Sequence, residues 1–345
     1  MLTGIRRLEL ADVELPEPGP SDAVVEVRAC AICATNLHGW ADPARRSPGS
    51  ALPGTLGHEV AGVVTATGQD VRELAPGDRV CLEPALACAC GRCPACRSGD
   101  ALGCRDGSPL SVWGFAEAMV VPERGLVSVP DGLDLEVAAL AEPLASALHG
   151  IRHSWTAARS SGRIDGVHVA VLGAGPIGLF ALAAARCLGA GEVTVLARQD
   201  HQARAAAALG ADRVLDGDAP DAAQALRRLR PELAIEAAGA RATLETAFAS
   251  VARGGEVIVL GLFDGPQALD VTSAVLRNLR AFFAVAYGTL GGVSDFSLAL
   301  QMLSEPDTAL ARIITHRFRL EDVDEAFNTA ATRHSGAQRV VVRSP

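Results

Sequence analysis

One stretch decides how much of this chain folds: Val167-His168-Val169-Ala170-Val171-Leu172-Gly173-Ala174-Gly175-Pro176-Ile177-Gly178. It begins as an apolar strand, turns at closely spaced glycines and opens an Ala-rich helix. Such glycines permit a tight turn and close approach of a pyrophosphate, and a helix N-terminus offers unpaired N–H groups to an anion. The stretch therefore predicts a dinucleotide-binding turn built by Gly173, Gly175, Pro176, Ile177 and Gly178. The alternative is a Gly-rich turn in an unrelated α/β sheet.

The strand–helix pattern repeats along the chain, where apolar strands alternate with Ala-rich helical segments. Strands are expected at 167–172, 193–197, 233–236 and 256–261, and this βαβ pattern predicts a parallel sheet covered on both faces. Residues 167–185 are apolar enough to resemble a membrane span. The glycines in their middle favour a buried strand, turn and helix instead.

The end of the second expected strand predicts the nucleotide type. An NAD site usually has an acidic residue there, whereas this chain has Ala197 followed by Arg198. A guanidinium in that place suits a 2′-phosphate, so we expect NADP(H) to be preferred over NAD(H). Two alternatives stay open: Asp200 takes the part of the acid, or Arg198 is a solvated surface charge.

Four cysteines stand close together near residue 100: Cys90, Cys93, Cys96 and Cys104. Their gaps let four thiolates converge on one centre, which predicts a closed structural zinc site. A ferredoxin-type cluster would space the last cysteine differently, and a disulfide framework suits small secreted chains. The alternatives that stay open are redox-active thiols and a metal cluster. Cys88, just before the run, has no assignment.

The first 150 residues read as short strands separated by turns, with β-like runs at 23–28, 60–67 and 115–121, which suggests a sandwich or partly open barrel. Strand-like character returns at 313–319 and 338–342, with a short helix between. This last segment is expected to fold back onto the first domain.

Composition bounds the functional class. A chain of 345 residues with 49% hydrophobic and 21% charged residues is typical of a two-domain globular enzyme. Its net charge of -9 argues against nucleic acid or an anionic membrane as a partner. No signal-peptide pattern is evident, and an odd count of nine cysteines, most of them clustered, fits a reducing cytoplasm.

A second group of metal-ligand residue types precedes the dinucleotide motif: Cys33, His58, Glu59 and Glu142. A lone histidine such as His58 is usually a satisfied core residue. A thiol, an imidazole and carboxylates together favour a catalytic zinc site, which needs three protein ligands and an open position.

These motifs together resemble the zinc-containing medium-chain dehydrogenase/reductase family, which includes alcohol, sorbitol and threonine dehydrogenases. The resemblance rests on 57–62 with Gly68, on the four-cysteine run, on the glycine turn and on the closing segment 314–322. It implies an α/β fold: a Rossmann parallel-sheet cofactor domain at 151–290, and a β-rich GroES-like catalytic domain with a structural zinc lobe at 1–150 and 291–345.

The resemblance also implies residue roles. Cys33, His58 and Glu142 match ligands of one catalytic zinc, and Glu59 matches a carboxylate that binds or approaches it. Thr35 matches the hydroxyl that takes the substrate proton, and His38 the relay to solvent. We also count Arg339 among the cofactor-binding residues. Three anionic ligands would leave Zn²⁺ at a net -1, so one carboxylate is expected to sit behind a water for part of the cycle.

Departures from the family pattern bear on the substrate. Asn36 replaces an Asp usual beside the relay Thr, Ala284 stands where the polyol branch has an Arg, and Gly39 replaces a common aromatic residue. Simple sorbitol-like substrates are therefore not favoured. Three aromatic side chains either line a different pocket or belong to the core: Trp40, Trp113 and Phe115.

The expected activity is reversible hydride transfer between NADP(H) and a secondary alcohol of polyol, sugar, cyclitol or amino-alcohol type. The alternatives are a zinc-independent quinone or alkene reductase of the same superfamily and a non-catalytic zinc-stabilised protein. The expected partners are a small-molecule alcohol or ketone and further copies of the chain, as a homodimer or homotetramer with residues 281–286 as its edge strand.

Overall fold

The chain forms two compact units in the computed structural model, which describes residues 1–42, 54–306, 308–332 and 335–344. Unit 1 comprises residues 1–142 and 303–345, and unit 2 comprises residues 143–302. Helix α5 (Ala141–Arg152) takes the chain from unit 1 into unit 2, and helix α12 (Asp295–Leu303) takes it back. The domain limits expected from the sequence, at 150/151 and 290/291, stay a prediction.

Unit 2 is built on a six-stranded sheet in the order β10-β9-β8-β11-β12-β13, with every neighbouring pair parallel. Its strands are β8 (His168–Leu172), β9 (Glu192–Ala197), β10 (Arg213–Asp216), β11 (Leu233–Glu236), β12 (Glu256–Val259) and β13 (Arg280–Phe283). The strand order reverses beside β8, the position where Rossmann folds bind dinucleotides. The parallel α/β sheet predicted from the alternating pattern is thus confirmed.

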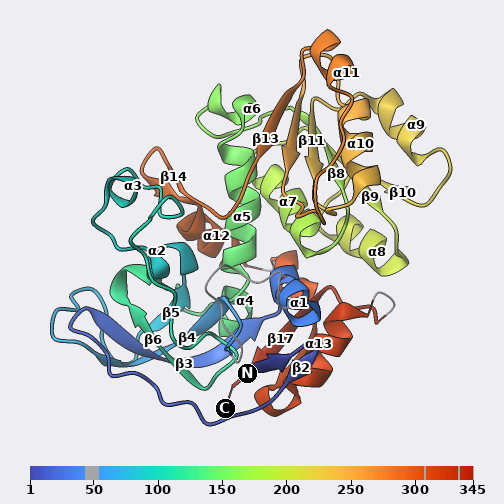
Figure 1. Cartoon of the computed structure of the whole chain (residues 1–345). Helices are drawn as coiled ribbons and strands as arrows, with labels where there is room; N and C mark the ends of the chain where they lie inside the picture. The colour runs from blue at the N-terminus through green and yellow to red at the C-terminus, as the bar shows by residue number, and fades with distance from the viewer. Residues whose placement is uncertain (43–53, 307, 333–334, 345) are drawn as a thin grey trace. The chain divides into compact units, whose positions relative to one another are not determined.

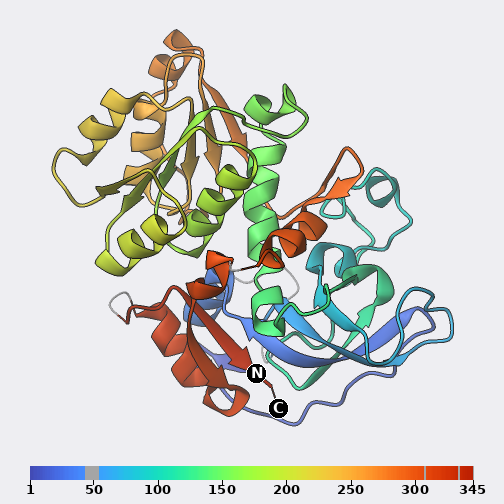
Figure 2. The ribbon, with the colours of Figure 1, turned by 180° about the vertical axis from the view of Figure 1, so that it is seen from behind.

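Helices flank this sheet in both views (Figures 1 and 2). They are α7 (Pro176–Cys187), α8 (Asp200–Ala208), α9 (Ala222–Leu229), α10 (Arg241–Ser250) and α11 (Val271–Leu276). Side chains from strands and helices, among them Leu172, Leu226 and Leu244, form one buried apolar cluster. The apolar run 167–185 forms β8 and most of α7, and none of the described helices is long and apolar enough to cross a bilayer.

Unit 1 is built on a seven-stranded sheet in which β6 pairs with β3 and the others follow the order β16-β17-β3-β4-β5-β7. Its strands are β3 (Asp22–Ala31), β4 (Glu59–Thr67), β5 (Arg79–Leu82), β6 (Ala118–Pro122), β7 (Leu126–Ser128), β16 (Ile314–Arg319) and β17 (Arg339–Arg343). β17 pairs antiparallel with β3, opposite Ala29 to Ala31. The closing segment therefore returns to the first domain, as the sequence predicts.

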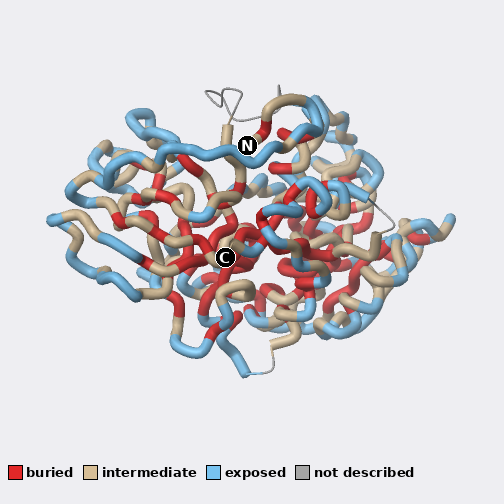
Figure 3. The backbone as a smooth tube through the Cα atoms, turned by 90° about the horizontal axis from the view of Figure 1, so that it is seen from below, coloured by how far each residue is buried: buried red, intermediate tan, exposed pale blue. Residues whose placement is uncertain are grey.

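Two helices pack beside the β16–β17 end of this sheet: α1 (Ala34–Ala41) and α13 (Val323–Ala331). Trp40 is buried there and its ring lies 5.8 Å from that of Phe327, which also contacts Phe115 edge-on at 5.3 Å. Trp113 packs against the apolar cluster of the sheet. These three aromatic residues therefore belong to the apolar core of unit 1, which was one of the two alternatives. Figure 3 shows the buried backbone as red segments enclosed by exposed ones.

Candidate functional site

The glycine turn of unit 2 joins β8 to α7. Gly173 has a φ of +107°, which only glycine adopts easily, and a Cβ atom at Gly178 would lie 1.8 Å from the Gly173 carbonyl oxygen. Gly175 is the N-cap of α7, with Pro176 at the first helical position, and a Cβ atom there would meet no atom within 4 Å. The turn thus leaves open space in front of a helix N-terminus, as a pyrophosphate site requires.

Arg198 follows directly after the last residue of β9, Ala197, so the structure places it at the strand end. Its side chain is 60% exposed, and its Nε donates to Asp218 Oδ1 at 2.7 Å. Asp200 begins α8 instead of ending the strand. An ion pair this exposed contributes at most about 1 kcal/mol, so Arg198 is available to pair with a phosphate.

The four cysteines of the lobe converge in unit 1. Their sulfur atoms all lie within 4.8 Å of one another, with Cys93 Sγ 3.4 Å from Cys96 Sγ and Cys90 Sγ 3.9 Å from Cys96 Sγ. Zn–S bonds of about 2.3 Å in a tetrahedron separate the sulfur atoms by about 3.8 Å. Backbone N–H groups of Arg92 and Cys93 help to lower the pKa of the Cys90 thiol to about 6. The donor set and its spacing fit a closed zinc site.

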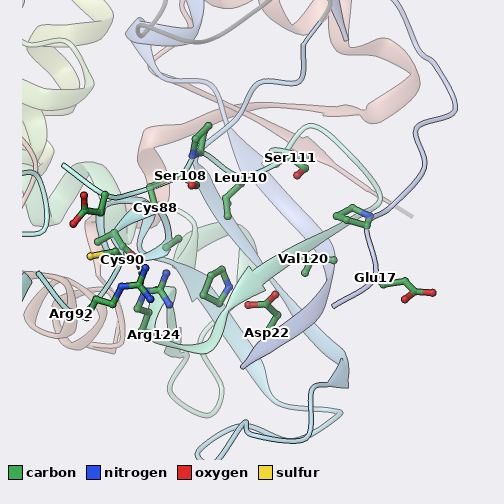
Figure 4. A pocket seen from close by; sticks show the side chains of 16 residues that line it. Glu17, Asp22, Cys88, Cys90, Arg92, Ser108, Leu110, Ser111, Val120 and Arg124 are labelled. Atoms are coloured by element: carbon green, nitrogen blue, oxygen red, sulfur yellow. Dashed lines mark hydrogen bonds between the residues drawn. The ribbon is translucent and has the colours of Figure 1, made fainter. Parts of the chain in front are cut away.

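Cys88, at the end of the short helix α2 (Pro84–Cys88), has other neighbours than the four converging cysteines. Its carbonyl accepts the Ser108 N–H at 2.9 Å, and burial raises the pKa of its thiol. It lines a hollow of about 400 Å³ together with Arg92, Arg124 and Asp22 (Figure 4). The Cys88 thiol is half-buried and is not part of the converging four-cysteine group.

A second cluster of metal-ligand side chains is assembled in unit 1 from separate segments. Cys33 lies between β3 and α1, His58 immediately precedes β4, and Glu59 is the first residue of β4. One ligand atom from each lies within 4.8 Å of the other two. Glu142, in the first turn of α5, is outside that group but interacts electrostatically with Cys33 and His58.

The charges of this cluster are strongly coupled. Burial opposes ionisation of Cys33, yet the neighbouring His58 imidazole lowers the pKa of the thiol to about 6. Cys33 in turn raises the pKa of His58 to about 9, against the effect of burial. Burial raises the pKa of Glu142 to about 7, with Cys33 adding to the rise. The positive charge of protonated His58 therefore stabilises the Cys33 thiolate.

Glu59 and Arg339 form a fully buried ion pair through Glu59 Oε2 and Arg339 Nη2. Arg339 Nη1 also donates to the Ile32 carbonyl at 3.1 Å. Glu59 Oε1 is buried without a hydrogen-bond partner among the described residues. A buried unpaired carboxylate oxygen is costly, and beside Cys33 and His58 a cation would compensate it.

The first turn of α1 carries the predicted proton relay. Asn36 is buried, and its Oδ1 accepts the Cys33 N–H at 3.1 Å, so an amide performs the positioning expected of an Asp. Thr35 is exposed, and its hydroxyl hydrogen-bonds the Cys33 sulfur. His38 follows three residues later, and this spacing places it on the same helix face as Thr35. His38 is partly exposed.

Comparison with known proteins identifies the family. Residues 19–131 match the model of the alcohol dehydrogenase GroES-like domain, and residues 176–305 match that of the zinc-binding dehydrogenases. An L-threonine 3-dehydrogenase from Aeromonas salmonicida is 30% identical over 95% of this chain and 94% of its own. The chain belongs to the zinc-containing medium-chain dehydrogenase/reductase family.

Other members of this family agree along the whole chain. An L-idonate 5-dehydrogenase from Vitis vinifera is 29% identical, covering 96% of this chain and 90% of its own. A protein from Sinorhizobium meliloti, assigned as a zinc-binding dehydrogenase and crystallised with NADP, superimposes with a TM-score of 0.86 at 30% identity, over 99% of this chain and 97% of its own. As a family member this protein is a zinc-dependent oxidoreductase that acts on an alcohol and uses NAD(P).

Sequence reasoning missed several contacts of the candidate sites. It assigned Arg339 to the cofactor, whereas the described contacts of its side chain are with Glu59 and Ile32. Its role at the cofactor stays a prediction. It also gave Arg198 no partner, although Asp218 binds it. One signal in the sequence could have indicated the ion pair. Arg339 directly precedes three valines, at 340–342, and an arginine in such a buried strand needs a buried anion as its partner.

The glycine turn predicts two different outcomes for one added methyl group. Gly178→Ala should lower the free energy of unfolding by about 2 kcal/mol or more, because its Cβ overlaps the Gly173 carbonyl. Gly175→Ala should change the free energy of unfolding by less than about 0.5 kcal/mol, because the added methyl group meets no atom. It should nevertheless weaken nucleotide binding, because the methyl group would occupy the space predicted for the pyrophosphate. Urea unfolding and calorimetric titration with NADP⁺ measure both. Equal stability of the two variants would contradict this account.

The Glu59–Arg339 pair predicts a non-additive double-mutant cycle. Arg339→Met should destabilise unit 1 by about 3–5 kcal/mol, because it leaves the Glu59 carboxylate buried and unpaired. Adding Glu59→Gln should restore a large part of the loss. Chemical denaturation of the four proteins tests this, with the exposed Arg7→Met as the control. Additive effects of the two substitutions would refute the coupling.

Proposed function

We propose that this protein catalyses reversible hydride transfer between a secondary alcohol and NADP(H) at the Cys33–His58–Glu59 cluster. The observation that carries the proposal is the convergence of a thiol, an imidazole and a carboxylate in unit 1, with Glu142 close enough to interact with two of them. A zinc-independent quinone or alkene reductase has no need of this donor set. A non-catalytic zinc protein needs the closed cysteine lobe only.

Cys33, His58 and Glu142 are the proposed zinc ligands, with Glu59, which also pairs with Arg339, as a fourth group beside Cys33 and His58. When bound there, zinc supplies a Lewis acid that lowers the pKa of an alcohol hydroxyl. Cys33 suits this role because a neighbouring positive charge lowers the pKa of its thiol to about 6, and Zn²⁺ would supply such a charge. Its orientation is supported by the Asn36 hydrogen bond to its backbone N–H.

Thr35 and His38 are the proposed path of the substrate proton. The Thr35 hydroxyl donates to the Cys33 sulfur, and its oxygen can still accept a hydrogen bond from a substrate hydroxyl. His38, three residues later on the same face, is partly exposed and can take the proton on to solvent. This order of groups leads from the buried cluster to the surface of α1.

The proposed substrate is a small alcohol of polyol, sugar, cyclitol or amino-alcohol type. The relatives named as threonine and idonate dehydrogenases act on substrates of these kinds. Ala284, which stands where the polyol branch has an Arg, argues against simple sorbitol-like chains.

NADP(H) is the proposed cofactor. Ala197 ends β9 without an acidic group, and Arg198 is exposed beyond it. The similar protein from Sinorhizobium meliloti was crystallised with NADP. Asp218 pairs with Arg198 at 2.7 Å and would lie near a 2′-phosphate, so it is expected to weaken the preference that Arg198 creates.

Self-association and a cytoplasmic location stay predictions. β13 is the edge strand of the unit 2 sheet, and its Phe283 and the following Val285 are 64% and 66% exposed. An exposed apolar edge of this kind suits pairing with a second copy, which supports the proposed homodimer or homotetramer.

The activity is tested with a panel of secondary alcohols and ketones in which absorbance at the NAD(P)H band is followed. We expect turnover by the wild type, a loss of about 10³-fold or more in Cys33→Ser with one zinc fewer per chain, and neither effect in Cys187→Ser, which changes an exposed cysteine. Turnover that persists in Cys33→Ser after chelation would favour the zinc-independent reductase. No turnover of any substrate by the zinc-loaded wild type would favour a non-catalytic protein.

Cofactor choice is tested by reversing one charge. Arg198→Asp should shift the ratio of kcat/KM for NADP⁺ over NAD⁺ at least about 100-fold towards NAD⁺, because it replaces the phosphate-pairing group by an acid. Asp218→Asn should shift it the other way. Arg228→Asp, the same charge change on the exposed face of α9, is the control and should leave the ratio unchanged. A wild type that prefers NAD⁺ would overturn the cofactor proposal.

A further inference from the structure

Three metal-ligand side chains of unit 2 have no part in the proposed reaction: His149, His153 and Asp295. The histidines stand four residues apart at the end of α5, where the His153 N–H donates to the His149 carbonyl at 3.0 Å and continues the helical turn. Asp295 is fully buried and is the first residue of α12. Two histidines at this spacing face the same way and form a chelating pair.

The distances suit a shared ion. His149 Nδ1 lies 3.0 Å and His153 Nε2 lies 3.3 Å from the same oxygen, Asp295 Oδ2. Ligand atoms bound tetrahedrally to Zn²⁺ at about 2.0–2.1 Å are about 3.3 Å apart. His153 Nε2 is buried and makes no hydrogen bond of acceptable geometry among the described residues. Its polar contact is therefore with Asp295 Oδ2 at 3.3 Å, and an ion between the two atoms would bind both.

The surroundings hold the carboxylate in place for such an ion. Arg152 forms an ion pair with the other oxygen, Asp295 Oδ1, and the Gly288 N–H donates to Oδ2 at 2.9 Å. Arg152 also donates to the carbonyls of Leu290 and Val293, which fixes its position. Groups that orient a ligating carboxylate from behind in this way are typical of metal sites.

Gly288 leaves room on one side of the imidazole rings. A Cβ atom added there would lie 3.5 Å from His149 Nδ1 and 3.7 Å from His153 Cε1, which is ordinary contact distance. The rings themselves are 4.3 Å apart at an angle of 34°. The side chains of His149 and His153 are 17% and 21% exposed, so this group of side chains is open to solvent.

We propose that His149, His153 and Asp295 bind a divalent transition-metal ion of the Zn²⁺ type, which ties the end of α5 to the start of α12. Two imidazoles and one carboxylate form a donor set that suits zinc and related ions over magnesium or calcium. The site lies wholly within unit 2 and does not depend on the proposed reaction. Its test therefore reads metal content and stability, not activity.

The experiment compares zinc content per chain after equilibration with micromolar free Zn²⁺ and gel filtration, using metal analysis and native mass spectrometry. The wild type should hold one ion more than His153→Gln, which keeps an N–H for Asp295 but removes the imidazole. His201→Ala, a histidine of α8 in the same unit, should match the wild type. The test is the difference in zinc per chain between the wild type and His153→Gln. This difference does not depend on how fully the cysteine-containing sites are occupied.

A cobalt titration gives a second, independent readout. Co²⁺ bound by two imidazoles and a carboxylate should add visible d–d absorption without the near-ultraviolet thiolate band that the cysteine sites give. This component should be absent in His153→Gln, and added Zn²⁺ should raise the midpoint of thermal unfolding of wild type more than that of the variant. Equal zinc content, equal cobalt spectra and equal thermal shifts in wild type and a folded His153→Gln would overturn the proposal.

Discussion

The buried ion pair between Glu59 and Arg339 is the constraint on which the rest of unit 1 depends. Arg339 belongs to β17, in the last ten residues of the chain, and its guanidinium contacts Glu59 and the Ile32 carbonyl. Ile32 precedes Cys33, and Glu59 follows His58. One side chain thus holds both neighbours of the candidate metal ligands. Because Glu59 and Arg339 stand 280 residues apart in the sequence, this contact joins the two separate segments that make up unit 1.

The same pair changes the charge of the cluster. Zn²⁺ with ionised Cys33, Glu59 and Glu142 would carry a net -1, which weakens a Lewis acid. The Arg339 guanidinium adds one positive charge within the same buried region and brings that sum to zero. It binds Glu59 Oε2, while Oε1 has no hydrogen-bond partner among the described residues. A carboxylate held in this way can approach or leave a metal ion without leaving a charge wholly uncompensated.

How much the sequence could predict depends on how local each signal is. The turn at Gly173, the spacing of Cys90 to Cys104 and four strands of unit 2 are each encoded within a short window, and the structure has them where expected; β10 (Arg213–Asp216) was missed. Contacts between distant segments have no such signature. Arg339 meets Glu59 from 280 residues away, and Asp295 meets His149 from 146 residues away. Their pairing follows from the topology of two sheets, which the residues alone do not specify.

Locality also separates the two cysteine-containing clusters. The four thiols of the lobe come from a single loop around α3 (Pro94–Arg97), so this segment can surround an ion on every side and leave no position for a substrate. Cys33, His58 and Glu59 come from two segments held together by the sheet, and Glu142 reaches them from a third. A site assembled from separate elements need not close around its ion. This difference in assembly is the reason why we propose the dispersed cluster for the chemistry and the compact one for stability.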